Sequence, residues 1–339
     1  MTTEINASLG ASSTHTVFGA GLIGGYLGSA LMANGCRVTW VVRERVKAKL
    51  ADGIRITDYE GHEEKLTELQ CFDPEQASAA PDFLWITVKC TGLESAIADI
   101  AQHVGPKTLV VSLQNGLGSE DILQAAFPDN KVVRGVFAAN VVEPSPGHLH
   151  RGTEGGLDLG MTPETAGLES VLTHSVMPFA LHRDIEGLVW AKLQLNLNNA
   201  VNALSDIPLK AELSNRGYRK VLAAAQKEML KVVAAKGIDL PKLTALPPKV
   251  LPVVLGLPDW IYLKLAQKML AIDPEARSSM WCDLDDGRKT EINFLNGAVV
   301  EEGEKLGIAC PVNQRLVDMI RQIENGALQK GVASSSILA

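Results

Sequence analysis

Short apolar runs alternate with helix-period segments along the first half of the chain. Strands are predicted for the runs rich in Val, Thr, Phe or Trp, namely HTVFGA, CRVTWVV, DFLWITVK, TLVVSLQN and VVRGVFAA. Helical spacing of apolar residues marks the segments GLIGGYLGSALMANG and GLESAIADIAQHV between them. This alternation favours a parallel sheet with helices on its faces. Residues 147–160, GHLHRGTEGGLDLG, predict a glycine-rich hairpin instead.

The pattern changes after residue 185 to long helical periodicity. Helices are predicted over residues 187–205, 212–236, 259–271, 275–307 and 312–324. No strand pattern of comparable strength follows in the sequence. The predicted fold class is therefore an α/β N-terminal Rossmann-like domain with a parallel sheet, followed by an all-helical C-terminal domain.

Domain boundaries follow from this change of pattern. The predicted parts are a disordered tail at 1–14, the Rossmann-like domain at 15–185, the helical domain at 186–326 and a C-terminal tail at 327–339. Since no flexible linker separates the domains, a crevice between them is the expected ligand site. The proline-rich segment 241–258 is a candidate lid over that crevice.

Composition excludes several classes of protein. With 339 residues, the chain has about the length of two domains at roughly 150 residues each. The formal net charge of −7 argues against a nucleic-acid surface, which needs a basic field. The five cysteines are scattered without a CxxC pair and the histidines show no ligand spacing, so no metal site and no disulfide framework are predicted, as fits a cytoplasmic protein. Neither a secretory signal nor a membrane segment is predicted.

The clearest motif is VFGAGLIGGYLGSAL, in which Gly19, Gly21 and Gly24 match GxGxxG between a strand and a helix. Gly19 allows the tight turn, Gly21 lets the backbone approach a pyrophosphate, and Gly24 allows close packing of helix and strand. The predicted dinucleotide-binding segment is Gly19, Ala20, Gly21, Leu22, Ile23 and Gly24.

The second strand ends in VVRER, where an NAD-specific site usually carries Asp or Glu on the ribose hydroxyls. Arg43 is expected to face the ribose, with Arg45 nearby, and an arginine there can pair with a 2′-phosphate. The residues therefore favour NADP(H) over NAD for the 15–185 domain. Two alternatives stay open: a register shift of one residue places Glu44 at the ribose, and Arg43 could be a solvated surface charge.

Two further polar residues follow buried strands. DFLWITVK ends in Lys89 and TLVVSLQN ends in Asn115. Because ligands of open parallel sheets bind at the carboxyl ends of the strands, both side chains are expected at the cofactor crevice. Lys89 could hold a phosphate or a carboxylate, and Asn115 could bind the nicotinamide ribose or the substrate. Either residue could instead cap a helix or end a strand.

The stretch WAKLQLNLNNAVNAL, residues 190–204, has a second face beside its apolar stripe. Lys192, Asn196 and Asn199 are spaced at i, i+4 and i+7, so they share one side of a helix. Asparagine lowers helix propensity because it competes for backbone hydrogen bonds, and a solvated face usually carries Glu, Lys or Arg. This line of amides behind a lysine indicates a binding face, although a lysine whose stem covers apolar neighbours is the alternative.

Six separated motifs resemble one family. GAGLIGGYLG, ITVKCTGLE, VSLQNGLGSED, WAKLQLNLNNA, SSMWCDLDDGRKTEINFLNG and GIACPVNQ occur in this order, and the chain from about His15 to Glu324 resembles the ketopantoate reductase (2-dehydropantoate 2-reductase) family. The resemblance implies NADPH as cofactor and reduction of a 2-keto acid, with ketopantoate first, to a 2-hydroxy acid. The helical domain is then the substrate and dimerisation domain, and its exposed apolar helices are compatible with a homodimer.

The resemblance also assigns residues. Lys192 matches the catalytic lysine, Asn196 the asparagine one turn later, and Ser279 and Glu291 the substrate-binding serine and glutamate. Reducing a ketone requires a hydride at carbon and a proton at oxygen, so Lys192 is expected to act as general acid. Glu291, on the predicted helix 275–307, is expected to accept the substrate hydroxyl and to interact with Lys192. Ser279 is expected to hold the carboxylate.

The chain also departs from the family pattern at two positions. At other positions the chain follows the pattern, and Lys89 and Asn115 match the family's cofactor-side and substrate-side polar pair. Where the pattern has an asparagine two turns after the lysine, this chain has Ala200, with Asn199 one place earlier, and a second expected asparagine is replaced by Ala276. These departures make a same-family reductase for another 2-keto acid the first alternative. A non-catalytic NADP-binding sensor and a β-hydroxyacid dehydrogenase of similar plan are the other two.

Overall fold

The computed structural model describes residues 13–172, 175–266 and 273–338. They form two compact units: residues up to Gln114 together with Ser119–Ile185 make one, and Asn115–Gly118 together with the residues from Glu186 onward make the other. Residues 1–12 of the predicted tail at 1–14 lie outside the described residues. Among the described helices, none combines the length and the apolar character needed to cross a membrane.

The α/β unit is built on a mixed sheet, which has eight strands in the described part of the chain. Its strands are β1 (Thr14–Phe18), β2 (Arg37–Val41), β5 (Gln70–Phe72), β6 (Phe83–Ile86), β7 (Leu109–Ser112), β8 (Val132–Phe137), β11 (Leu157–Gly160) and β12 (Phe179–His182). Their order is β12-β11-β8-β7-β6-β1-β2-β5, with only the β8–β11 pair antiparallel. The neighbouring strands β8-β7-β6-β1-β2-β5 of this sheet follow the doubly wound order of a Rossmann fold, which confirms the predicted fold class.

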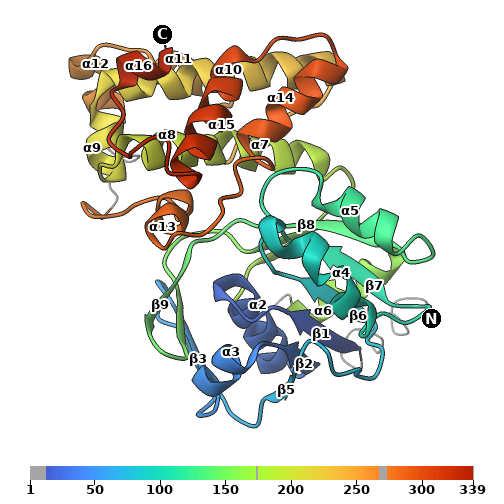
Figure 1. The fold of residues 1–339 in the computed structure, drawn as a ribbon. Coiled ribbons are helices and arrows are strands. Elements are labelled where there is room, and N and C mark those ends of the chain that lie inside the picture. Colours follow the sequence, from blue (N-terminus) through green and yellow to red (C-terminus); the bar gives the residue numbers. More distant parts are fainter. Residues whose placement is uncertain (1–12, 173–174, 267–272, 339) are drawn as a thin grey trace. The chain divides into compact units, whose positions relative to one another are not determined.

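Helices cover both faces of this sheet (Figure 1). Alternate residues of each strand point to opposite faces, so Val17 and Phe18 of β1 belong to two different apolar clusters. Leu27 of α2 (Leu22–Ala33) lies in the cluster of Val17, whereas α4 (Leu93–Ala101) and α5 (Ser119–Ala126) contribute to the cluster of Phe18. The unit is completed by α3 (Glu44–Lys49), the 3-10 turn η1 (Cys90–Gly92) and α6 (Pro163–Leu172).

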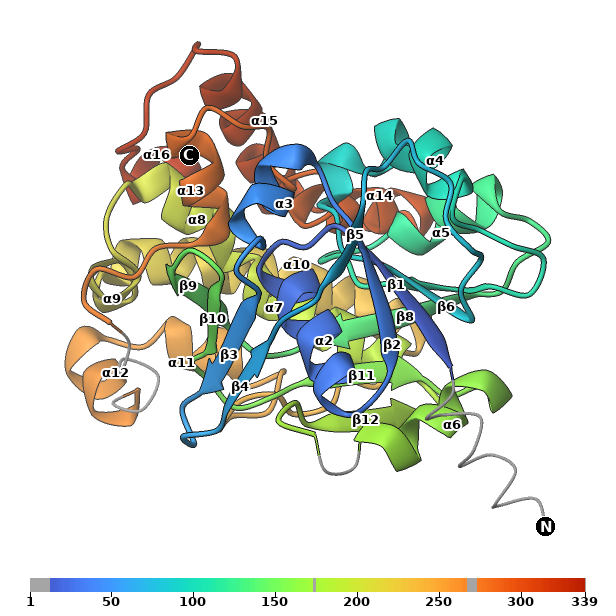
Figure 2. The same cartoon turned by 90° about the horizontal axis from the view of Figure 1, so that it is seen from below.

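A second, smaller sheet packs on α2 (Figure 2). It consists of β3 (Ile54–Asp58), β4 (Glu63–Leu66), β9 (Val141–Ser145) and β10 (His148–Arg151), in the order β4-β3-β10-β9. The predicted hairpin at 147–160 is therefore wrong, because β10 pairs with β9 and β3 whereas β11 pairs with β8 and β12. Gly147 closes the β9–β10 turn at φ +73°, and Gly155 and Gly156 carry the chain from one sheet to the other.

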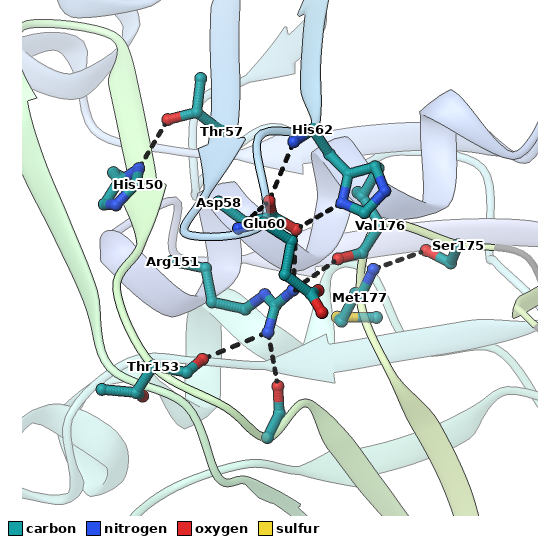
Figure 3. Close-up of polar contacts among 11 residues, drawn as sticks. Thr57, Asp58, Glu60, His62, His150, Arg151, Thr153, Ser175, Val176 and Met177 are labelled. Atoms are coloured by element: carbon teal, nitrogen blue, oxygen red, sulfur yellow. Dashed lines mark hydrogen bonds and ion pairs between the residues drawn. The ribbon is translucent and has the colours of Figure 1, made fainter.

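Arg151 of β10 stabilises the segment in which the chain passes from the small sheet to the large one (Figure 3). Its buried guanidinium donates to Asp58 Oδ2 at 2.8 Å, Glu60 Oε2 at 3.1 Å and the Thr153 carbonyl at 3.2 Å. Burial by itself would raise the pKa of Asp58, but hydrogen bonds from His62 and Arg151 hold that pKa below its usual value. Asp58, Glu60 and His62 bring three possible metal-ligand atoms within 4.8 Å of one another, but Arg151 already pairs with both carboxylates.

His15 in β1 makes the stability of this unit sensitive to acid. Burial lowers the pKa of His15 from 6.5 to about 4, and the Asp82 charge offsets only part of this shift. Its Nδ1 accepts from Trp85 Nε1 at 3.1 Å, and its Nε2 lies 2.8 Å from Ser13 Oγ, an arrangement that suits the neutral ring. The folded protein therefore keeps His15 unprotonated in mild acid.

We expect the free energy of unfolding to fall as the pH drops from 6.5 toward about 4, because the unfolded chain then binds a proton at His15 that the folded chain rejects. The contribution is complete above pH 6.5 and amounts to about 3 kcal/mol. Urea unfolding of wild type and His15→Gln across this range measures it, since glutamine still accepts from Trp85 and does not titrate. Equal pH slopes for the two proteins would contradict the assignment.

The second unit is helical throughout its regular structure in the described residues, with α10 at its centre (Figure 1). Its helices are α7 (Glu186–Asn196), α8 (Asn198–Ser205), α9 (Leu209–Ser214), α10 (Arg216–Lys236), α11 (Leu251–Leu255), α12 (Asp259–Leu265), α13 (Ser279–Asp285), α14 (Asn296–Lys305), α15 (Pro311–Glu324) and α16 (Ser334–Leu338). Asn215 caps α10 by accepting from the Gly217 amide, and Gly237 ends it at φ +69°.

Three predicted helices are broken in the structure. The prediction for 187–205 becomes α7 and α8, which meet at Leu197, and that for 212–236 becomes the end of α9 and α10, separated by Asn215. The prediction for 275–307 is wrong in its middle: Gly287 adopts φ +66°, and α14 begins only at Asn296. The end of the predicted helix 259–271 lies outside the described residues.

The proline-rich segment and the C-terminal segment both pack within the helical unit. Gln194 Nε2 of α7 donates to the Pro248 carbonyl at 2.8 Å, and Leu251 and Leu255 of α11 are buried, so residues 241–258 cover part of the helical unit's own core. The role of this segment as a lid over the crevice stays a prediction. The predicted tail at 327–339 is wrong, because α16 places Ile337 in the main apolar cluster.

Candidate functional site

The glycine-rich turn lies where β1 and β6 diverge, at the carboxyl ends of both strands. Gly19 adopts φ +98°, and the Thr87 hydroxyl after β6 hydrogen-bonds to the Phe18 carbonyl at 3.1 Å and to the Gly19 carbonyl. A Cβ on Gly24 would overlap the Gly19 carbonyl and the Thr87 hydroxyl, whereas a Cβ on Gly21 would meet nothing within 4 Å. The turn is thus tight at Gly19 and Gly24 and open at Gly21, as a dinucleotide cradle requires.

Arg43 is the residue before α3, two positions after the end of β2, and lines a surface cavity of about 550 Å³. The cavity is also lined by Glu44, Asp73, Pro74, Glu75, Gln76 and Asp99. Lys47 pairs with Glu44 at 3.9 Å and with Asp73 at 3.6 Å. Arg43 is exposed, and within the described chain no ion pair engages it. Both Arg43 and Glu44 therefore face the cavity, with the Glu44 carboxylate next to a lysine.

Lys89 is exposed three residues after β6 and caps η1 with extended backbone angles. A Cβ on Gly19 would lie 2.9 Å from Val88 Cγ1, so the segment that carries Lys89 is packed directly against the glycine-rich turn. The structure thus brings two of the predicted cofactor-side segments together at the switch point of the sheet.

Asn115 belongs by its contacts to the helical unit, a placement that the sequence analysis missed. The Leu117 amide donates to the Phe294 carbonyl at 3.0 Å, and a Cβ on Gly116 would overlap that same carbonyl. Gly116 and Gly118 both have positive φ, +80° and +89°. The available signal was the spacing of these glycines after Asn115, which lets this loop press against the turn that contains Glu291.

The same loop is anchored in the α/β unit through Arg134 of β8. This buried guanidinium donates to the Gln114 carbonyl at 2.7 Å, the Ser119 hydroxyl at 2.7 Å and the Glu120 carboxylate at 2.9 Å. The residues on either side of Asn115–Gly118 are therefore held by one side chain. Asn115, half-buried, is presented on a short and well-restrained loop.

Lys192 and Asn196 lie one turn apart on α7, and both are half-buried. The Asn196 Nδ2 atom is buried and has no hydrogen-bond partner among the described residues. A buried amide donor without a partner is costly, so such an atom marks a place where a ligand or water completes the hydrogen bonding. The lysine and the amide supply two donors on one side of the helix.

Asn199 and Ser279 are joined through Ser278. The Ser278 hydroxyl donates to the Asn199 carbonyl at 3.2 Å and accepts from the Trp281 amide at 3.1 Å, which caps the first turn of α13. Ser279 is the first residue of that helix and is exposed. The predicted substrate residues of α8 and α13 are thus brought side by side.

Glu291 is buried, but not on a helix as predicted. It begins the turn before α14, and its carbonyl accepts from the Phe294 amide at 3.0 Å and the Leu295 amide at 3.2 Å. The helical pattern of RKTEINFLNG fails here because Leu295 leaves the helical region, with φ −104° and ψ −97°. Glu291 is nevertheless buried, and the nearby Ile292 and Leu295 belong to the main apolar cluster of the helical unit.

The two departures from the family pattern occupy different environments. Ala200 is fully buried in the core of the helical unit, whereas Ala276 is half-buried in the approach to α13 and its carbonyl accepts from the Leu209 amide at 2.9 Å. An asparagine at either position would offer an amide where this chain offers a methyl group.

The fold and these residues define a two-unit protein in which a doubly wound nucleotide-binding unit is joined to a helical unit carrying a lysine, amides, a serine and a carboxylate. Residues 15–164 match the family model described as Ketopantoate reductase PanE/ApbA, and residues 184–324 match the model of its C-terminal part. The chain belongs to the ketopantoate reductase family of oxidoreductases.

Similar proteins agree with this membership. A 2-dehydropantoate 2-reductase of Archaeoglobus fulgidus is 28% identical over 316 residues, which cover 91% of this chain and 97% of the relative. The crystal structure of a PanE/ApbA family ketopantoate reductase from Ralstonia eutropha JMP134 superposes with a TM-score of 0.78 at 27% identity, covering 93% of this chain and 99% of that one. A D-mandelate dehydrogenase solved with NADH and anilino(oxo)acetate shares the fold, with a TM-score of 0.76 at 22% identity and coverage of 93% and 99%.

Proposed function

We propose that the protein reduces a 2-keto acid to the 2-hydroxy acid with NADPH, and that 2-dehydropantoate is its first candidate substrate. The observation that carries the proposal is the lysine and amide pair of α7: a half-buried Lys192 one turn from Asn196, whose buried Nδ2 has no partner in the described chain. Family membership over both units supplies the reaction class.

Lys192 is the proposed general acid. As negative charge develops on the ketone oxygen, its ammonium stabilises that charge and donates the proton. Asn196 donates a neutral hydrogen bond beside it, which orients the ketone or the ammonium without adding charge. Glu291 is the proposed acceptor for the substrate hydroxyl, while Ser279 and Asn199 bind the carboxylate end, with Asn115 on the neighbouring loop.

The cofactor, when bound, supplies the hydride. The open position over Gly21 and the tight packing at Gly19 and Gly24 fit a pyrophosphate on the turn from Gly19 to Gly24. Lys89 is the proposed partner of a phosphate or of the nicotinamide ribose. Arg43 at the cavity after β2 is the proposed partner of the 2′-phosphate, which is the reason for preferring NADPH.

The direct test is consumption of NADPH, and of NADH in parallel, with 2-dehydropantoate, aliphatic branched 2-keto acids and the keto acid of mandelate. The last is included because a protein of this fold is a D-mandelate dehydrogenase. A higher kcat/KM for 2-dehydropantoate supports the named substrate. A higher kcat/KM for another acid would support the same reaction on a different substrate, as the departures from the family pattern at Ala200 and Ala276 suggest. Tight NADPH binding without turnover of any acid would favour a cofactor sensor.

We expect Arg43→Ala to raise the KM for NADPH about tenfold and leave that for NADH within about twofold, because a charge-assisted hydrogen bond contributes roughly 1.5–3 kcal/mol and its exposure here reduces that value. The matched control is Arg55→Ala, which removes an exposed arginine from β3 of the small sheet in the same unit. Equal losses for both cofactors would contradict the assignment of Arg43 to the 2′-phosphate.

A further inference from the structure

A buried amide and a buried carboxyl lie directly behind the turn that carries Ser279. Asn202 of α8 and Glu212 of α9 are both fully buried, and Asn202 Nδ2 donates to Glu212 Oε2 at 2.9 Å. The same Nδ2 donates to the Ile207 carbonyl at 2.9 Å. On its other side, Asn202 Oδ1 accepts from the backbone amide of Ser278 at 2.8 Å.

We propose that Asn202 and Glu212 are positioning residues that set the place of Ser279 in the substrate site. This proposal rests on the proposed function, because it takes Ser279 and Asn199 as substrate-binding residues. The connection runs from the Glu212 carboxyl to the Asn202 amide, from there to the Ser278 amide, and from the Ser278 hydroxyl to the Asn199 carbonyl.

The orientation of the Asn202 amide is what Glu212 determines. An asparagine amide has a donor end and an acceptor end, and a rotation by half a turn exchanges them. With Nδ2 facing the Glu212 carboxyl and the Ile207 carbonyl, Oδ1 must face the Ser278 amide. Without the carboxyl, one acceptor for Nδ2 is lost and the orientation that holds Ser278 is less strongly enforced.

Stability alone is a weak reason for this pair. Burial raises the pKa of Glu212 to about 8, although hydrogen bonds from Asn202 and Asn198 counter part of the shift, and Glu212 Oε1 has no hydrogen-bond partner in the described residues. Apolar side chains often fill such space at equal or lower free energy, whereas a buried polar pair can specify orientation. Its place beside the start of α13 indicates which orientation is specified.

The two candidate roles can be separated because the helical unit contains a matched pair elsewhere. Asn313, near the start of α15, donates from Nδ2 to Glu228 Oε2 of α10 at 2.8 Å, and both residues are buried. No proposed site residue lies on α15. Glu228 variants therefore show what happens when a buried carboxyl that binds an asparagine is removed away from the proposed site.

The experiment compares Glu212→Leu, Glu212→Gln and Asn202→Ala with Glu228→Leu in the full chain. We expect Glu212→Leu and Asn202→Ala to raise the KM for the keto acid about tenfold, with kcat within about threefold and NADPH affinity unchanged. Glu212→Gln should restore KM to within about twofold of wild type, because its amide oxygen still accepts from Asn202. An unchanged KM in Glu212→Leu and Asn202→Ala would overturn the proposal, and so would an equal rise in Glu228→Leu.

Amide hydrogen exchange of residues 278–285 gives a second readout that does not depend on turnover. We expect faster exchange there in Glu212→Leu and Asn202→Ala but not in Glu212→Gln or Glu228→Leu. If wild type turns over no keto acid, the proposed function fails, while the exchange result still decides whether the two residues hold the start of α13. Unchanged exchange would then overturn the positioning role.

Discussion

Lys192→Ala is expected to lower kcat and kcat/KM for the keto acid together by about 10³-fold, within the roughly 10²- to 10⁴-fold that a positioned general acid contributes. Both parameters should fall because the ammonium acts on charge that develops only in the transition state. The affinity for NADPH should stay unchanged, since the lysine lies on α7 of the helical unit and the glycine-rich turn belongs to the other unit. Steady-state kinetics with the best acid of the panel, together with cofactor titration, measure these effects.

Two variants sharpen this test. Lys220→Ala removes an exposed lysine from α10 of the same unit and should leave kcat/KM within about twofold of wild type. Lys192→Arg keeps the positive charge but gives up its proton much less readily, so its rate should lie between those of alanine and wild type. A loss of less than about tenfold in Lys192→Ala would remove Lys192 from the role of proton donor, because general acid catalysis is worth more than that.

The strands around the nucleotide turn were predictable because their signal is local. The runs HTVFGA and DFLWITVK contain the apolar stretches VF and FLWI, and buried parallel strands are read correctly from such stretches. The four-residue strand β4, with the sequence EEKL, is mostly polar and exposed, so no apolar pattern marks it, although it pairs with the preceding strand β3. The 147–160 hairpin failed because β10 pairs with β9, which precedes it, and with the distant β3, whereas β11 pairs with β8 and β12 of the other sheet.

In the candidate site the residue types were predictable, and the backbone that presents them was only partly so. Lys192 and Asn196 lie on one helix as their spacing indicates. Glu291 has a helical pattern around it, yet it lies in a turn, because Gly287 and Leu295 leave the helical conformation. The glycines after Asn115 indicate a loop that allows a close approach, but they do not show that the Phe294 carbonyl is what lies against Gly116.

The orientation of the Asn202 amide behind Ser278 and Ser279 could not be predicted from the sequence either. Asn202 could be recognised as an unusual residue within a helix, but its partners Glu212 and Ser278 come from two other segments. Periodicity places a side chain on a face, and hydrogen-bond direction is decided by whatever the fold brings opposite it. Positioning residues are therefore the part of a site that sequence patterns predict least well.

Gly21→Ala is expected to weaken NADPH binding about 100-fold, equal to ~2.7 kcal/mol, without a matching loss of stability. Gly21 has φ −73° and ψ −162°, which an alanine can adopt, and a Cβ built there meets nothing within 4 Å of the protein. The methyl group would therefore be tolerated by the fold and would obstruct only a ligand that approaches the backbone. Equilibrium titration with NADPH and thermal unfolding without it measure the two effects separately.

Gly24→Ala and Gly152→Ala complete the comparison. A Cβ on Gly24 overlaps the Gly19 carbonyl and the Thr87 hydroxyl, so this variant should lose both stability and NADPH binding. Gly152 has room for a methyl group, with its nearest neighbour at 4.0 Å, and should lose neither. Normal NADPH affinity in a stable Gly21→Ala protein would place the cofactor elsewhere. Loss of binding confined to Gly21→Ala and Gly24→Ala would identify the open position over Gly21 as the place where the pyrophosphate meets the backbone.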